Sequence, residues 1–262
     1  MNVNHQIIDF KPLEQTSALS LHGCLKEYST KTVHVHPFHQ ILFITAGISL
    51  LITDKERKPL YGSMCAFLPA GAPHRTGTAG SSVEYSSIYF KRNLFIPQHD
   101  DIVIFRLTPL ARELILECTS GTVNDLTVGM KKNYFELLIK MLPEEMQNRI
   151  LFCLPETSDE ICRKIISFIE KNYSRTLHLK DFCSVLPYSE KHIARLFRNR
   201  MNISIFEYLR MYRIFKATIK LRNSGDKILD IALDCGYEAL SVFYTDFKKY
   251  FSMTPGEFRN KN

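Results

Sequence analysis

The sequence LKDFCSVLPYSEKHIARLFRNRMNISIFEY, residues 179–208, is followed by a second version of itself, ILDIALDCGYEALSVFYTDFKKYFSMTPGEF, in residues 228–258. Apolar positions recur 49 residues later up to a tight turn, and 50 residues later beyond it. Their spacing of three and four is typical of helices with one buried face. Each copy therefore predicts a short helix, a tight turn and a second helix.

The two predicted turns differ in the residue available to form them. In the second copy Gly236 can take the positive φ that a tight turn favours. The first copy has Pro187 there, which cannot, so we expect another turn geometry. Small residues, Cys183 and Ala232, stand where the helices of each copy would cross.

One long helix is predicted between the copies. Ser204 is the expected N-cap, Glu207 would complete a capping box, and Asn223-Ser224-Gly225 would end the helix. Its roughly 19 residues, at about 1.5 Å each, span about 28 Å. Successive major-groove faces on one side of B-DNA lie about 34 Å apart, so two recognition helices would lie about one DNA turn apart.

Charge divides the chain. The formal net charge is +7, and because basic and acidic residues are equal in number in residues 1–156, the whole excess lies in residues 157–262. A basic module beside a neutral one is typical of a protein that meets a polyanion with one domain. On charge alone, a solvated lysine-rich surface explains the excess equally well.

The repeat resembles the double helix-turn-helix DNA-binding domain of the AraC/XylS family of bacterial transcription regulators. The motifs that carry the resemblance, in order along about 160–259, are Ser189 to Arg198, Glu207 to Arg210 with Arg213 and Ala217, Ile228 to Ala232 with Gly236-Tyr237, and Phe247-Lys248 through Thr254 to Arg259. Departures are Pro187, and Asn202 and Ser252 where the family usually has Gly. The resemblance implies a regulator rather than an enzyme, with double-stranded DNA and RNA polymerase as partners.

The second helix of each copy is expected to enter the major groove. In the first copy the predicted DNA-binding residues are Ser189, Glu190, Lys191, Ala194 and Arg195. Arg195 is the expected base reader, because a guanidinium can bond guanine through two donors, whereas Lys191 suits phosphate equally well. Plain surface charge is the alternative for both, and His192 is expected to pack on a neighbouring helix.

The second copy has a different predicted set: Leu240, Ser241, Tyr244, Thr245 and Lys248. The first four carry no positive charge, so thymine methyl contacts and hydroxyl contacts would carry any base readout, with Lys248 on phosphate. Alternatively, Leu240 and Tyr244 pack against another domain or subunit.

The N-terminal half alternates short apolar runs with turn residues over residues 20–95, the pattern of an antiparallel β-barrel or sandwich. It resembles a cupin barrel and, by its position, the effector domain of the same regulator family. The predicted fold class is α+β: an N-terminal cupin-like antiparallel β-barrel with following helices, and a C-terminal all-α double helix-turn-helix domain. The predicted domains are 1–106 for effector sensing, 107–156 for a helical dimerisation or linker segment, and 157–262 for DNA binding.

A polar cluster is predicted inside this barrel. The period of two places alternate residues from 34 to 40 on one strand face. The predicted small-molecule effector pocket consists of His34, His36, Phe38, Gln40, His74 and Arg75. The cupin resemblance also implies a divalent-metal site at His34, His36, Gln40 and His74, but Gln40 replaces the usual anionic Glu. Both interpretations, organic pocket and metal site, stay open.

Residues 107–142 return to a helical pattern. Leu110, Leu114 and Cys118 form one apolar stripe, and Tyr134, Leu137, Leu138 and Met141 form another. In the resembled family such helices commonly pair two subunits, which predicts a homodimer. Helices that only cover their own barrel would show the same spacing.

Several classes of protein are disfavoured. No apolar run approaches the ~18 residues that a bilayer crossing needs, and the first residues lack a signal-peptide pattern, so we expect a cytoplasmic protein without a membrane partner. The seven scattered cysteines, an odd number without CxxC, predict neither a disulfide framework nor a thiolate zinc cluster. Two rival functions remain: a cupin metalloenzyme with a basic appendage, which lacks an evident acid, base or nucleophile, and an architectural DNA-binding protein without an effector.

Overall fold

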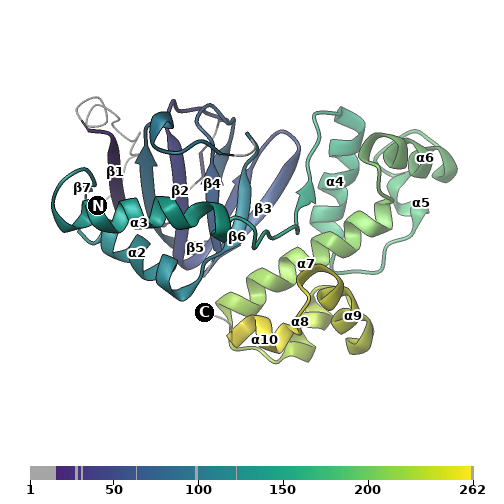
Figure 1. Cartoon of the computed structure of the whole chain (residues 1–262). Helices are drawn as coiled ribbons and strands as arrows, with labels where there is room; N and C mark the ends of the chain where they lie inside the picture. The colour runs from purple at the N-terminus through teal and green to yellow at the C-terminus, as the bar shows by residue number, and fades with distance from the viewer. Residues whose placement is uncertain are drawn as a thin grey trace. The chain divides into compact units, whose positions relative to one another are not determined.

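The computed structural model describes residues 16–260 except 27–28, 31, 63, 98–99 and 122, so residues 1–15 of the predicted effector domain lie outside it (Figure 1). The described chain divides into two compact units. The first unit holds the residues up to Ser49 together with Leu60–Ile150. The second unit holds Leu50–Pro59 together with the residues from Leu151 onward.

The first unit is built on a β-sheet with the strand order β6-β4-β2-β5-β1-β7. The strands are β1 (Ala18–Lys26), β2 (His39–Ile52), β4 (Met64–Leu68), β5 (Arg75–Phe90), β6 (Val103–Arg106) and β7 (Val123–Asp125). Pairing is antiparallel, with Ala18 opposite Phe90 and Gln40 opposite Leu68. Among the described strands the path ends at β6 and β7, so the sheet is open where a barrel was predicted.

Two helices cover one face of this sheet, α2 (Pro109–Thr119) and α3 (Gly129–Glu145) (Figure 1). Thr108 caps α2 by accepting a hydrogen bond from the N–H of Ala111, and Pro109 suits the first turn because its missing N–H would be unpaired there. Their apolar faces join the core, in which Phe43 and Phe105 are fully buried. The α+β class is confirmed, and the segment expected to be helical holds these two helices with the short strand β7 between them.

The second unit is helical apart from a small strand pair. Its helices are α4 (Glu160–Asn172), α5 (Leu179–Phe182), α6 (Glu190–Met201), α7 (Ile205–Asn223), α8 (Ile228–Asp234), α9 (Leu240–Phe251) and α10 (Pro255–Asn260). The strand β8 (Leu154–Pro155) pairs with the start of β3 (Glu56–Tyr61), so that Arg57 lies opposite Leu154. None of the helices in the described parts of the chain has the length and hydropathy to span a bilayer.

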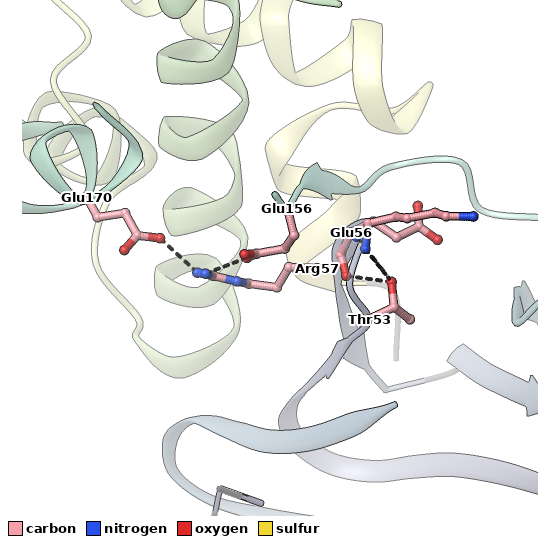
Figure 2. A network of polar contacts seen from close by, with 6 residues as sticks. Thr53, Glu56, Arg57, Glu156 and Glu170 are labelled. Atoms are coloured by element: carbon pink, nitrogen blue, oxygen red, sulfur yellow. Dashed lines mark hydrogen bonds and ion pairs between the residues drawn. The ribbon is translucent and has the colours of Figure 1, made fainter. Parts of the chain in front are cut away.

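An ion-pair network lies beside this strand pair (Figure 2). Arg57 Nη2 lies 2.6 Å from a Glu156 carboxylate oxygen, and its Nη1 donates to Glu170 on α4 at 2.9 Å. Burial alone would lower the pKa of Arg57, and the two carboxylates more than offset it, so the pKa is raised. Thr53 orders the preceding turn by accepting a hydrogen bond from the N–H of Glu56 at 3.1 Å. The sequence pattern had not indicated this network.

Candidate nucleic-acid interface and effector site

The first predicted recognition helix is α6. Ser189 caps it, its Oγ accepting a hydrogen bond from the N–H of His192 at 3.4 Å. A stripe of Ile193, Phe197 and Met201 is buried at helical spacing, which leaves the opposite face in solvent. On that face Lys191 and Arg195 are exposed, and neither makes an ion pair or side-chain hydrogen bond with the described chain.

The other predicted residues of the first motif surround these two cations. Ser189 and Glu190 are exposed, and Ala194 is half-buried at the edge of the stripe. His192 is exposed, with its ring centroid 4.9 Å from that of Tyr188 in the turn, so the expected packing on a neighbouring helix is wrong. The turn contains Pro187, and none of its described residues has a positive φ. This turn places Tyr188 beside the His192 ring.

The spacer helix α7 is continuous over its 19 residues. Ser204 caps it by accepting a hydrogen bond from the N–H of Glu207 at 3.1 Å, which confirms the predicted N-cap. Residues on several sides are buried, among them Tyr208, Tyr212 and Leu221, because the helix lies between two small cores. The left-handed residues Asn202 and Ser252, with φ of 57° and 54°, end α6 and α9 at corresponding places in the two motifs.

The second predicted recognition helix, α9, also buries one apolar stripe, but its exposed residues differ from those of α6. It buries Phe243, Phe247 and Phe251. Of the predicted set, Leu240, Ser241, Thr245 and Lys248 are exposed, and Tyr244 is half-buried. Val242, 51% exposed, was missed by the sequence reasoning, although its place between two predicted residues in the first turn could have indicated it.

The predicted polar cluster of the first unit does assemble. The ring centroid of His74 lies 4.5 Å from that of His34 and 5.1 Å from that of His36. Gln40 joins them, with its Oε1 3.1 Å from His36 Nε2 and its Nε2 donating to Tyr89 Oη at 2.8 Å. His36, Gln40 and His74 are buried, whereas His34 is exposed.

The local geometry differs from the predicted strand. β2 begins at His39, so residues 34–38 do not alternate along a strand, and His34 pairs with His74 through an isolated bridge. Phe38 packs against Leu19 and Tyr89. Arg75 is the first residue of β5, directly after His74, and is half-buried. The three histidines converge because two separate segments meet, which a period of two cannot predict.

A cavity of about 530 Å³ lies in the first unit, at residues the sequence reasoning mostly missed. Its lining includes the loop Pro69 to Pro73, Arg92, Phe95 and Ile96. Arg92 donates to the Ala70 carbonyl at 2.6 Å, and His39 accepts from the Ala70 N–H at 3.1 Å. None of the six predicted pocket residues lines this cavity.

The histidines do not fit the metal site that the cupin resemblance implied. Within the described residues no group of three or more His, Cys, Asp or Glu is placed to hold a metal ion. Both ring nitrogens of His36 face oxygen atoms, Nδ1 at 2.8 Å from the Phe38 carbonyl and Nε2 at Gln40. Burial lowers the pKa of His36, and burial lowers that of His74 to about 4, so the His74 ring is neutral near pH 7. His36, Gln40, Ser87 and Tyr89 therefore form a hydrogen-bonded cluster.

Comparison with known proteins gives one match to the C-terminal helical residues and others over most of the chain. Residues 182–261 match the family model described as "Helix-turn-helix domain". The "HTH-type transcriptional activator RhaR" of Mannheimia succiniciproducens is 24% identical over 244 residues, which cover 87% of each chain. Residues 182–261 are therefore a helix-turn-helix domain of the AraC type. The chain is also 22% identical to the "HTH-type transcriptional regulator NimR" of Escherichia coli (strain K12) over 245 residues, 94% of this chain and 88% of NimR.

Among solved structures, unsaturated fatty acid bound ToxT from Vibrio cholerae strain SCE256 aligns over 93% of this chain and 95% of its own. The sequence identity is 16% and the TM-score 0.38.

Proposed function

We propose that the chain is a sequence-specific DNA-binding transcription regulator whose first unit responds to a small molecule. The observation that carries the proposal is α6, which presents Lys191 and Arg195 in solvent on a helix anchored by its opposite face. A helix of the same design, α9, follows at the other end of the unbroken α7. This arrangement suits two consecutive major-groove faces of one duplex.

The two recognition helices would read DNA by different chemistry. In α6, Arg195 is proposed to bond a base and Lys191 a base or phosphate, with Ser189, Glu190 and Ala194 beside them. In α9, Leu240, Ser241, Tyr244 and Thr245 offer methyl, ring and hydroxyl contacts, and Lys248 offers phosphate contact. We therefore propose that α6 supplies most of the base discrimination and α9 mainly positions the duplex.

The domain roles and further partners are proposed as well. Residues 1–106 sense the effector, 107–156 serve dimerisation, and 157–262 bind DNA. The pocket proposal keeps His34, His36, Phe38, Gln40, His74 and Arg75. A small molecule acts on transcription only if it binds two arrangements of the protein with different affinity. RNA polymerase is the proposed second macromolecular partner.

The homodimer proposal is supported by apolar residues that α2 and α3 leave in solvent. Leu110 on α2 is 54% exposed, and Met130 and Leu137 on α3 are 64% and 43% exposed. With the partly buried Tyr134 and Met141, the α3 residues repeat at steps of three and four, as a helix-pairing seam requires. Sedimentation velocity of the full chain tests this, because a monomer at micromolar concentration contradicts it.

The test of the function is selection of bound fragments from random DNA with the full chain, followed by titration of the selected duplex. Arg195→Ala is expected to cost about 1–3 kcal/mol on that duplex and to relax the preference at one base pair. Arg163→Ala on α4 removes an equal charge from an exposed site and is the control. An equal loss from Arg195→Ala on every sequence would make it a phosphate contact, and failure to select any motif would refute the proposal.

A further inference from the structure

The two helix-turn-helix motifs approach each other at one junction in the second unit. One side is residues 173–176, which lead into α5, and the other is the turn Gly236 to Glu238 between α8 and α9. Thr176 Oγ1 donates to a Glu238 carboxylate oxygen at 2.8 Å. A Cβ added to Gly236 would lie 2.6 Å from the Tyr173 carbonyl oxygen, so the two backbones nearly touch. The positive φ of Gly236, 84°, gives a second reason for glycine at this position.

Arg213, near the middle of α7, binds both sides of this junction. Its Nε donates to the Tyr173 carbonyl at 2.8 Å, and its Nη2 donates to the Arg175 carbonyl at 2.9 Å. Its guanidinium carbon lies 5.8 Å from the centre of the Tyr237 ring, which makes a cation–π contact. One planar side chain therefore holds the entry to the first motif and the turn of the second.

The contact continues into the second recognition helix. The Tyr237 hydroxyl lies 3.1 Å from a carboxylate oxygen of Asp246 on α9. The Tyr237 ring therefore connects the Arg213 guanidinium to α9, so a movement of Arg213 would also move α9. On the other side, the Tyr173 to Thr176 segment leads directly to α5 and, through the first turn, to α6.

Other contacts at the junction are the Thr176–Glu238 hydrogen bond and the packing of the Tyr173 ring on Tyr212 and Lys216 of α7. A cavity of about 420 Å³ lies there, lined by Thr176, Leu177, Arg210, Arg213, Tyr237 and Val242 among others. An open, partly polar cavity lacks the interdigitated side chains that make a packed core rigid. Burial lowers the pKa of Arg213, and the nearby Glu238 and Asp246 carboxylates offset only part of this shift.

We infer that Arg213 is a positioning residue that fixes the angle between the two recognition helices and thereby sets the half-site spacing that the chain reads. This inference rests on the proposed DNA-binding function. One base pair inserted between the half-sites rotates the second by about 35° and shifts it by about 3.4 Å. A rigid junction penalises that change, whereas a loosened junction lets α9 follow the displaced groove.

The test uses the duplex selected with the wild-type full chain, and versions of it with one base pair inserted or removed between the two contacted segments. The wild-type chain is expected to lose at least about tenfold in affinity on the altered spacings. Arg213→Ala is expected to bind the original duplex more weakly and to lose less than about threefold further when the spacing changes. Discrimination of spacing is the readout, because a merely destabilised domain would lower binding to all three duplexes by one factor.

Three controls complete the design. Arg213→Lys keeps the charge but cannot donate in a fork to two carbonyls, so an intermediate spacing profile is expected. Arg163→Ala removes the same charge from an exposed site and is expected to keep the wild-type profile. Circular dichroism checks the fold, and should Arg213→Ala not fold, Arg213→Gln at the same position replaces it.

The outcomes separate the two proposals. If Arg213→Ala, or Arg213→Gln in its place, discriminates spacing as strongly as the wild-type chain, the positioning role is refuted and the DNA-binding function stands. If the wild-type chain selects no duplex, the proposed function is refuted, and this inference with it.

Discussion

Removal of the Arg57 guanidinium should destabilise the second unit. Arg57→Met keeps the aliphatic volume and leaves the Glu156 and Glu170 carboxylates without their shared cation. Taking one partner from a buried ion pair costs about 3–5 kcal/mol. The side chains of Arg57, Glu156 and Glu170 are 17%, 19% and 28% exposed, so water reaches the carboxylates and we expect about 2–3 kcal/mol.

The assay is urea and thermal unfolding of the full chain at neutral pH, followed by circular dichroism. At roughly 4 °C per kcal/mol for a unit of this size, the transition of the second unit should move down by about 8–12 °C. Glu170→Gln and the double variant complete a cycle, in which the double variant should be less destabilised than the sum of the single ones. This sub-additivity identifies the network itself as the source of the loss.

The matched control lies on the same helix. Glu160 pairs with Lys164 one turn further along α4, but these side chains are 73% and 54% exposed. Solvent and salt screen such a pair, so Glu160→Gln should leave the transition unchanged. The reasoning is wrong if Arg57→Met unfolds together with the wild-type protein, or if the cycle is strictly additive.

Two further predictions concern stability. Burial holds the pKa of His74 at about 4, below its usual 6.5. Between these two pH values the unfolded chain therefore binds a proton at His74 that the folded chain does not bind. The first unit should therefore lose up to about 3 kcal/mol as the pH falls from 6.5 to 4. Melting curves at several pH values should flatten for His74→Gln, and an unchanged slope would contradict this origin. Ser252→Gly relieves a left-handed residue, φ 54°, and should stabilise the second unit by about 0.5 kcal/mol in urea titration, more than Asn202→Gly. Equal or destabilising effects would show that no strain is stored at Ser252.

The helical half was predictable because its signals are local. Apolar spacing, the Ser204 cap and the polar stop after residue 222 act over one or two helix turns, so α7 ends within one residue of its predicted limit, and α6 and α9 follow the two turns as predicted. The exposure of Lys191 and Arg195 followed from the same periodicity. By contrast, α5 has only four residues, because a short helix is held by its neighbours rather than by its own pattern.

The first unit was predictable in class but less so in detail. Alternating apolar runs indicated an antiparallel sheet, but whether its edges close depends on the twist and pairing of strands far apart in the chain. The approach of His74 to His34 and His36 was expected from a family pattern and is made by an isolated bridge between two segments. The cavity beside Arg92 had no sequence signal, since its walls come from a loop and the segment after β5.

A neutral sheet-forming half and a basic half with two matching helical motifs were predictable from the residues alone, because periodicity, caps and charge are properties of neighbouring residues. The contact of Arg57 with Glu170, 113 positions away, and the bridging of the two motifs by Arg213 depend on the folded chain. The sequence predicted neither contact, although Arg213 belongs to the motifs that carry the family resemblance. The partners of the two arginines are backbone carbonyls and carboxylates brought close by chain folding, and no local pattern records which distant segment will supply the acceptor.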